Sequence, residues 1–291
     1  MKNKLMLFLF IPWCLCSNAQ FLSDSFLIDS HYRTFHFKKP SPLNTKSSLI
    51  FILHGSGGSG ERIMQRAEKL EVIAERENIL MVYPDGYKNY WNECRKMATS
   101  VANLENIDEN SFFNKMIDYF ISKYQISSDH IFAIGTSGGG HMAYKLAITM
   151  PERFKAITAI IANLPDTSNM DCIESKSPMS VMIINGTSDT LNPYEGGEMR
   201  TSTVKLGKVR STDETFKYWA AMDGYKGKPK KENLPDTDPT DGKTIEKYSF
   251  KKNRKREVVL LKVINGKHDY PNDIDVYLEA WSFFKRQIYP K

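Results

Sequence analysis

The stretch Ala133–Gly140, AIGTSGGG, decides how the rest of this 291-residue chain is organised. An apolar, β-branched run over His130–Ile134 ends at Gly135, and a helix-like pattern begins at His141. Between them lies G-x-S-x-G with Ser137 at its centre, which is the strand–turn–helix pattern of a nucleophile elbow. Glycines are needed beside this serine because a Cβ there would collide with the neighbouring strand or helix. The alternative interpretation is an ordinary Gly/Ser-rich loop.

The N-terminus has the pattern of a secretory signal peptide. Two lysines precede an apolar run over Leu5–Leu15, which is followed by the small residues of Ser17-Asn18-Ala19. The run is too short for a membrane span, and polar sequence follows it. We therefore expect residues 1–19 to be removed, residues 20–291 to form a single catalytic domain, and the protein to be secreted or periplasmic.

Composition and charge argue against several classes of partner. The chain is 41% apolar and 25% charged, and loss of the two signal-peptide lysines lowers its formal charge from +6 to +4. Such a mild excess does not indicate nucleic-acid binding. No C-x-x-C motif or close His/Asp cluster indicates a metal site, so no cofactor is expected. Cys94 and Cys172 remain after export and could pair in an oxidising compartment, but the sequence leaves their pairing open.

Strands alternate with helices along the chain, which indicates an α/β fold with a mostly parallel sheet covered on both faces. His31–Phe37 alternates apolar and polar residues and predicts an early edge strand. The other predicted strands are Leu49–Leu53, Ile79–Tyr83, Lys155–Ala162, Ser180–Ile184, Ile245–Phe250 and Glu257–Val263. The predicted helices cover 61–76, Ser111–Tyr124, Thr212–Asp223 and Asp273–Ile288. One more helix is predicted directly after the elbow.

A serine nucleophile needs a base, and the base needs an orienting carboxylate. In enzymes built around a nucleophile elbow these groups follow in the order Ser, Asp or Glu, His. His268 is the only histidine C-terminal to the plausible acids. Asp189 is the preferred acid because it follows a predicted buried strand and so lies at the carboxyl edge of the sheet. Asp166 is the second choice.

The glycine-rich segment after Leu53 predicts the second half of an oxyanion hole. The backbone N–H of Gly138, the residue after the nucleophile, is the first donor, and the N–H of Ser56 is the simplest second donor. The same segment could be read as a phosphate cradle, but it lacks the G-K-[ST] ending of a P-loop.

Seven motifs in order carry a resemblance to a known family. They are LHGSGGSG (Leu53–Gly60), YPDG (Tyr83–Gly86), WN (Trp91, Asn92), GTSGGG (Gly135–Gly140), GTSDTLNPYEGG (Gly186–Gly197), STDETFKYWA (Ser211–Ala220) and HDYP (His268–Pro271). From about Arg33 onward the chain resembles the secreted polyhydroxybutyrate depolymerase and feruloyl esterase group, a carbohydrate-esterase branch of the α/β-hydrolases.

The resemblance implies an α/β-hydrolase fold, and it assigns the triad roles to Ser137, Asp189 and His268. It also implies that Pro193–Gly197 and the loop around Trp91 border the substrate pocket. The sequence departs from the family pattern at three positions. Asn185 replaces a histidine, Lys267 replaces a glycine and Tyr270 stands where tryptophan is common.

The expected function is that of a serine esterase that removes feruloyl or acetyl esters from plant polysaccharide such as xylan. Trp91, Tyr194 and Tyr270 are candidate contacts for an aromatic acyl group, although core or rim packing would explain them equally well. One alternative is a polyhydroxyalkanoate depolymerase. Another is a non-catalytic carbohydrate-binding protein that retains the fold. Oligomeric state is not encoded in any pattern found.

Overall fold

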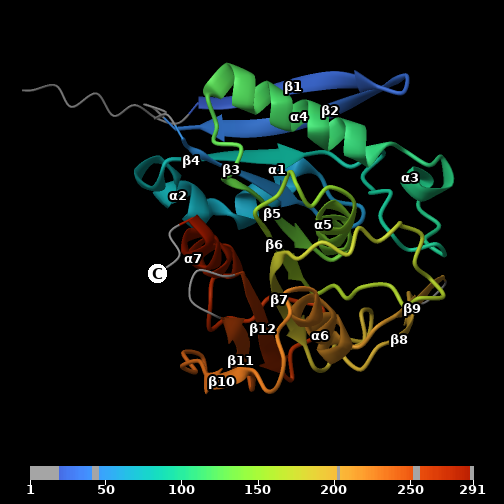
Figure 1. The fold of residues 1–291 in the computed structure, drawn as a ribbon, viewed down its shortest axis with the longest axis vertical. Helices are drawn as coiled ribbons and strands as arrows, with labels where there is room; N and C mark the ends of the chain where they lie inside the picture. Colours follow the sequence, from blue (N-terminus) through green and yellow to red (C-terminus); the bar gives the residue numbers. More distant parts are fainter. Residues whose placement is uncertain (1–19, 41–45, 202–203, 252–255, 289–291) are drawn as a thin grey trace, which may run out of the picture.

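A ten-stranded sheet runs through the molecule (Figure 1). The computed structural model describes residues 20–40, 46–201, 204–251 and 256–288, so the predicted signal peptide lies outside the described residues. The strands of this sheet are β1 (Gln20–Ile28), β2 (His31–Lys39), β3 (Ser48–Leu53), β4 (Ile79–Pro84), β5 (Ile131–Thr136), β6 (Ala156–Ile160), β7 (Ser180–Gly186), β10 (Lys230–Asn233), β11 (Thr244–Lys251) and β12 (Glu257–Ile264). A separate two-stranded ribbon consists of β8 (Gly197–Arg200) and β9 (Lys205–Val209).

The strands follow the order β1-β2-β4-β3-β5-β6-β7-β12-β11-β10 across the sheet. The six central strands, β4 to β12 in this order, are parallel. Two antiparallel strands extend the sheet on each side. The predicted fold class, an α/β-hydrolase fold with a mostly parallel sheet, is confirmed.

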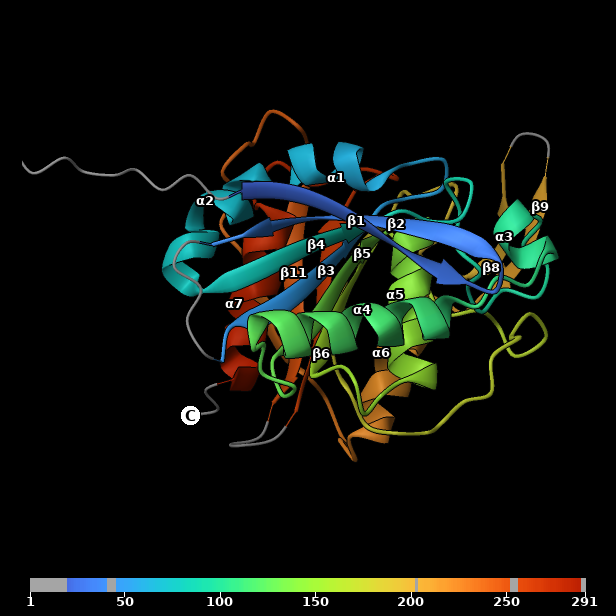
Figure 2. The same ribbon diagram turned by 90° about the horizontal axis from the view of Figure 1, so that it is seen from above.

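Helices cover both faces of this sheet (Figure 2). They are α1 (Gly60–Arg66), α2 (Glu68–Glu77), α3 (Val101–Leu104), α4 (Glu109–Tyr124), α5 (Gly138–Thr149), α6 (Thr212–Met222) and α7 (Val276–Ile288). Strand β3 shows how the two cores form: Leu49, Phe51 and Leu53 pack with residues of α4, α5 and α6. Ile50 and Ile52 point the other way, towards α1, α2 and α7. Burial on both faces explains why this strand is an uninterrupted apolar run.

Several predictions about individual elements were wrong. The strand that begins at His31 is not an edge strand, because β1 pairs with its full length from Gln20 opposite Lys39 to Ile28 opposite His31. The helix predicted over 61–76 is two helices, because Ala67 has the non-helical angles φ −92° and ψ 12°. The helix after the elbow begins at Gly138 rather than His141. Its first turn consists of three glycines, whose poor helix propensity gives no helical signal in the sequence.

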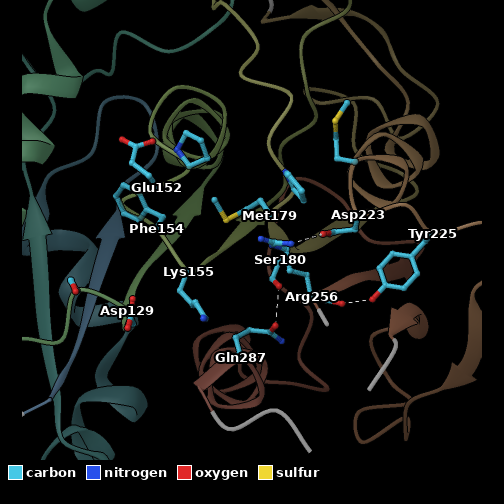
Figure 3. Close-up of a pocket in the computed structure, with 14 residues that line it drawn as sticks. Asp129, Glu152, Phe154, Lys155, Met179, Ser180, Asp223, Tyr225, Arg256 and Gln287 are labelled. Carbon is cyan, nitrogen blue, oxygen red and sulfur yellow. Dashed lines mark hydrogen bonds and ion pairs between the residues drawn. The ribbon is translucent and has the colours of Figure 1, made fainter. Parts of the chain in front are cut away.

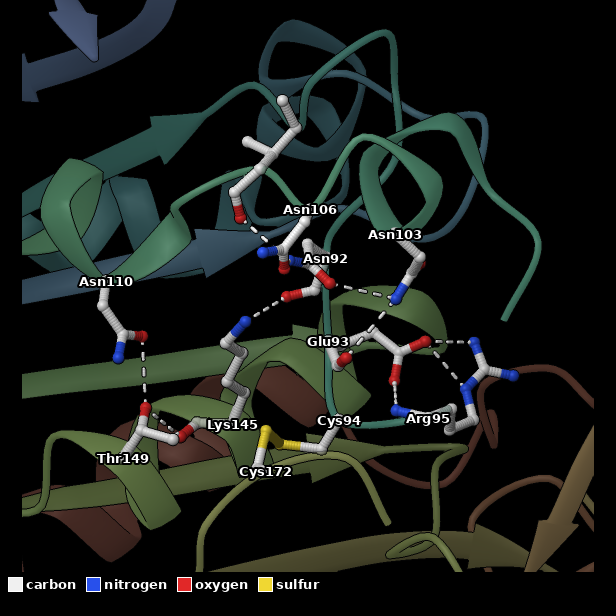
Figure 4. The surroundings of a disulfide bond; sticks show 11 residues. Asn92, Glu93, Cys94, Arg95, Asn103, Asn106, Asn110, Lys145, Thr149 and Cys172 are labelled. Carbon is white, nitrogen blue, oxygen red and sulfur yellow. Dashed lines mark hydrogen bonds and ion pairs between the residues drawn. A yellow bond between two sulfur atoms is a disulfide. The ribbon is translucent and has the colours of Figure 1, made fainter. Parts of the chain in front are cut away.

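A disulfide joins Cys94 to Cys172 and settles the pairing that the sequence left open (Figure 4). The two Cα atoms are 5.1 Å apart, and 78 residues separate the cysteines in the sequence. Next to the bond, the guanidinium of Arg95 forms a buried ion pair with Glu93 at 2.7 Å. The long irregular segment after β4 is thereby tied to the segment between β6 and β7. Among the described helices, none has the length and apolar character required to cross a membrane.

Candidate active site

Ser137 lies at the sharp turn between β5 and α5. Its φ of +53° and ψ of −117° form a sparsely populated backbone conformation for a residue with a side chain. Two contacts hold the turn: the Ser137 N–H donates to the carbonyl of Ile160 at 2.8 Å, and Gly135 approaches Gly139 closely. A Cβ on Gly135 would lie 1.9 Å from the Gly139 carbonyl oxygen. The G-x-S-x-G spacing is therefore a steric requirement here.

His268 and Asp189 reach Ser137 from the carboxyl ends of two neighbouring strands. Nε2 of His268 is 2.9 Å from Oγ of Ser137, and Nδ1 is 2.7 Å from Oδ2 of Asp189. The loops that carry them are in direct contact, since the N–H of Ser188 donates to the Gly266 carbonyl at 2.8 Å. The Asp189 side chain is 1% exposed and the His268 side chain 23% exposed. The structure thus brings the three sequence-predicted residues into one hydrogen-bonded chain.

The second oxygen of Asp189 fixes the direction of its carboxylate. Oδ1 accepts hydrogen bonds from the backbone N–H groups of Leu191 and Asn192, both at 2.8 Å. A carboxylate only accepts hydrogen bonds, so Nδ1 of His268 donates to Oδ2, and Nε2 is left to accept the proton of Ser137. Asp166, the second choice, accepts instead from Ser168 in its own turn at 2.9 and 2.7 Å.

The amides predicted to form the oxyanion hole lie close together. A Cβ built on Gly138 would come within 3.0 Å of the backbone nitrogen of Ser56, so the two backbones are in contact. The Gly138 N–H belongs to the first turn of α5, where backbone N–H groups have no acceptor within the helix. Ser56 lines the same cleft as Ser137, and Gly138 follows Ser137 in the chain, so the predicted pair of donors remains possible.

Two side chains that the sequence analysis did not select hold the segment containing Ser56. Oδ1 of Asp85 accepts from the N–H of Gly60 at 2.7 Å, and Nε2 of His54 accepts from the N–H of Gly86 at 2.9 Å. Burial lowers the pKa of His54, which keeps its ring neutral and Nε2 able to accept. The YPDG motif could have indicated the role of Asp85, because this aspartate directly follows a predicted buried strand, as Asp189 does.

Two of the three aromatic substrate contacts predicted from the sequence are placed elsewhere. Trp91 is 3% exposed, and its indole N–H donates to the carbonyl of His54 at 2.8 Å, so it supports the start of the glycine-rich segment. Tyr194 is also 3% exposed, and its hydroxyl donates to Asp213 at 2.9 Å. These aromatics serve the core, because their polar tips find protein partners and their rings are covered.

Tyr270, the third predicted contact, does line the cleft above Ser137. Its hydroxyl shares hydrogen bonds with Oγ1 of Thr136 at 2.6 Å and with the hydroxyl of Tyr277 at 2.9 Å. These bonds fix the ring, and one of them is made to Thr136, the residue before the nucleophile. The segment Pro193–Gly197, which the resemblance placed at the pocket border, is not among the residues that line this cleft, although Leu191, two residues before it, is.

Asn185 explains one departure from the family pattern. Its side chain is buried, its Oδ1 accepts from the Ala162 N–H at 3.1 Å, and its Nδ2 donates to Oδ1 of Asn163 at 2.8 Å. Nδ2 also reaches Oγ1 of Thr212, the first residue of α6, at 3.0 Å. The amide thus joins the ends of β6 and β7 to α6. Asn185 therefore has a structural role at the base of the loop that carries Asp189.

The cleft above Ser137 has a volume of about 560 Å³. Its lining residues are His54, Gly55, Ser56, Gly57, Gly58, Ser59, Arg62, Ile63, Arg66, Thr136, Ser137, Ile161, Leu191, His268, Asp269 and Tyr270. Within the described part of the chain, no three His, Cys, Asp or Glu side chains are grouped closely enough to hold a metal ion.

A second cavity, of about 530 Å³, lies at the opposite end of the sheet (Figure 3). Its lining includes Lys155, which precedes β6, and Ser180, the first residue of β7. It therefore opens at the amino ends of the parallel strands, and none of the sequence-predicted site residues lines it. The nucleophile, the base and the glycine-rich segment all converge at the other end, where ligands of open α/β sheets bind.

Comparisons with known proteins find esterases among the proteins that this chain is similar to. A putative esterase, NocK, from Nocardia uniformis subsp. tsuyamanensis is 26% identical over 238 residues, which are 80% of this chain and 68% of that protein. Feruloyl esterase B of Neurospora crassa is 28% identical over 143 residues, about half of each chain. The structure of an acetyl xylan esterase from Aspergillus awamori superposes with a TM-score of 0.64 at 19% identity, covering 91% of this chain and 99% of that one. That structure shares the fold.

The resemblance found in the sequence is confirmed by a family model. The model of the phospholipase/carboxylesterase family matches residues 39–220, a span that includes β3, the glycine-rich segment, the elbow and Asp189. Since this span is more than half of the chain, the protein belongs to the phospholipase/carboxylesterase family of α/β-hydrolases.

Proposed function

We propose that this protein is a secreted serine carboxylic-ester hydrolase that acts through an acyl-enzyme. The observation that carries the proposal is the chain of hydrogen bonds from Ser137 through His268 to Asp189, beside the paired amides of Ser56 and Gly138. A nucleophile, a base, an orienting carboxylate and an oxyanion site are the four parts that acyl transfer requires. A protein that only bound carbohydrate would have no need of all four.

In the first half-reaction, Oγ of Ser137 attacks the ester carbonyl while Nε2 of His268 takes the hydroxyl proton. Asp189 keeps the imidazole in the tautomer that can accept this proton and stabilises the imidazolium that forms. The carbonyl oxygen becomes an oxyanion, which the N–H groups of Ser56 and Gly138 would stabilise, each contributing about 10²–10³ in rate. His268 then gives its proton to the leaving alcohol, and the acyl group stays on Ser137.

In the second half-reaction, water replaces the alcohol. His268 takes a proton from this water as it attacks the acyl carbonyl, and the same two amides would stabilise the second oxyanion. Collapse of the intermediate breaks the bond to Oγ, and His268 returns the proton to Ser137. The acid product leaves, and no cofactor takes part in either step.

The substrates we propose are feruloyl or acetyl esters on plant cell-wall polysaccharide. Support comes from the names of the relatives, which include a feruloyl esterase and an acetyl xylan esterase. Ile63, Ile161, Leu191 and Tyr270 supply apolar surface in the cleft for the acyl group. Since Trp91 and Tyr194 are covered, an aromatic acyl group would rest chiefly on Tyr270.

The test is hydrolysis of methyl ferulate, p-nitrophenyl acetate and polyhydroxybutyrate by the mature protein and by Ser137→Ala. Ser282→Ala, an exposed serine on α7, is the matched control and should behave as the native protein does. We expect release from one of the two small esters that Ser137→Ala abolishes. Release that survives Ser137→Ala would refute the serine mechanism, and turnover of polyhydroxybutyrate alone would favour the depolymerase.

Export is tested separately. The chain is expressed with its native N-terminus, and the protein in the medium or periplasm is sequenced from its first residue. We expect cleavage after Ala19, so that the mature chain begins at Gln20. Recovery of the intact chain from the cytoplasm only would contradict this part of the proposal.

A further inference from the structure

Two arginines, Arg62 and Arg66, line the candidate active-site cleft. They stand four residues apart on α1, so their side chains leave the same face of the helix. Both side chains are exposed and share the cleft with Ser137 and His268. The function proposed above uses neither of them, since acetyl and feruloyl groups carry no carboxylate.

Both guanidinium groups are held by neighbours that do not neutralise them. Nη2 of Arg62 donates to the carbonyl of Gly57 at 2.8 Å. The guanidinium of Arg66 lies 5.5 Å from the centre of the Tyr270 ring, which is itself fixed by hydrogen bonds to Thr136 and Tyr277. Side chains that are already positioned lose less entropy when they bind a ligand.

The carboxylates near this wall are engaged with other cations. Asp269, which also lines the cleft, lies 3.3 Å from Nζ of Lys243. Asp189 is bonded to His268. Glu61 precedes Arg62 in the first turn of α1, and its charge acts on His36. Among the described residues, neither Arg62 nor Arg66 forms an ion pair, so this wall of the cleft presents two positive charges without counter-charge.

We propose that Arg62 and Arg66 form a subsite for a carboxylate on the ester substrate. A guanidinium fork matches a carboxylate with two parallel, charge-assisted hydrogen bonds, and two forks on one face define a direction for the ligand. The carboxylate would belong to the alcohol half, as in a uronic-acid residue of an acylated polysaccharide, or to the acyl half, as in a dicarboxylic half-ester. This inference rests on the proposed esterase function and narrows its substrate class.

The test compares matched neutral and anionic esters. Methyl O-acetyl-glucuronoside against methyl O-acetyl-glucoside probes the alcohol half, and p-nitrophenyl hemisuccinate against p-nitrophenyl butyrate probes the acyl half. The native protein is compared with Arg62→Gln, Arg66→Gln and the control Arg76→Gln, whose side chain is 74% exposed on α2, beside Glu77.

We expect the native protein to have a higher kcat/KM for the anionic member of one pair. In each cleft variant this preference for the anionic ester should fall by roughly tenfold, through a higher KM for that ester. Arg76→Gln should keep the native preference, and added salt should weaken it. Equal rates on both members of each pair, or variants that slow neutral and anionic esters alike, would overturn the subsite.

A binding measurement separates failure of the subsite from failure of the proposed function. Titration of Ser137→Ala with methyl glucuronoside, methyl glucoside and succinate by calorimetry needs no turnover. Binding of an anion that Arg66→Gln removes supports the subsite even if no ester is cut. Turnover of neutral esters that depends on Ser137, without any preference for anions in either assay, leaves the esterase standing and rejects the subsite.

Discussion

The carboxylate of Asp85 accepts a hydrogen bond from the backbone N–H of Gly60 at 2.7 Å, which ties the turn after β4 to the segment that carries Ser56. Its other oxygen is 3.1 Å from Nε2 of His36 on β2. Burial acts to raise the pKa of Asp85, but the hydrogen bonds from His36 and Gly60 outweigh it and hold that pKa below its ordinary value. An ionised side chain outside the proposed triad thus anchors one end of the proposed oxyanion segment.

Asp85→Ala should lower kcat by about tenfold with a smaller change in KM. The loss removes an anchor of the segment, and misplacement of an oxyanion donor weakens transition-state stabilisation more than ground-state binding. Steady-state kinetics on p-nitrophenyl acetate checks this. Asp85→Asn keeps an oxygen that can accept from Gly60 and should recover most of kcat. An Asn variant as slow as the Ala variant would mean that the charge, not the anchor, matters.

Asp189→Asn should reduce kcat by about 10⁴, because an amide at this position can stabilise the wrong tautomer of His268 and cannot stabilise the imidazolium. The fold should persist, since the Asn side chain can still accept from Leu191 and Asn192. Asp166→Ala is the matched control and should leave kcat unchanged. Comparable losses in both variants would place the orienting acid in doubt.

Removal of the disulfide by Cys94→Ala with Cys172→Ala should lower the free energy of unfolding by about 4 kcal/mol. A cross-link that closes 78 residues restricts the unfolded chain strongly in the chain-entropy model. Urea unfolding with and without reductant measures the effect. Reductant should destabilise the native protein and leave the double variant unchanged; a native protein insensitive to reductant would contradict the prediction.

Asp223 should make stability fall as the pH rises from about 4 to 7. Burial raises the pKa of this carboxyl to about 7, against the partial compensation of Arg256 with Nη1 3.8 Å from Oδ1 (Figure 3). Between pH 4 and 7 the native state therefore holds a proton that the unfolded state has released, so raising the pH favours unfolding. Above pH 7 the carboxyl is ionised in both states, so the free energy of unfolding no longer falls on its account.

Asp223→Asn should remove this slope and raise the free energy of unfolding by about 1–3 kcal/mol at pH 8, because Oδ2 is buried and has no hydrogen-bond partner among the residues that the structure describes. Urea unfolding at pH 4.5 and pH 8 gives the comparison. Asp118→Asn, whose side chain is 68% exposed, is the control and should show no such difference. An Asn variant that is less stable at pH 8 would show that the carboxylate has a favourable partner.

Features encoded in short stretches of the chain could be predicted from the sequence. The central strands are continuous apolar runs because both faces of the sheet are covered. The elbow can be recognised in the sequence because its backbone geometry leaves no room for a Cβ and therefore requires glycines. The acid and the base could be chosen by their order in the chain and their positions after predicted strands. Strand β1 was missed because Ser23, Asp24 and Ser25 interrupt its apolar residues, so β2 was taken for an edge strand.

What only the tertiary structure decided is which side chains meet. Ser137 and His268 are 131 residues apart, and their 2.9 Å contact depends on two loops brought to one edge of the sheet by the parallel strands between them. The same folding turns Trp91 inward, because its N–H finds the carbonyl of His54 and its ring is covered there. Residue type and order identify candidates from local chemistry, but the direction of a side chain depends on partners distant in the sequence.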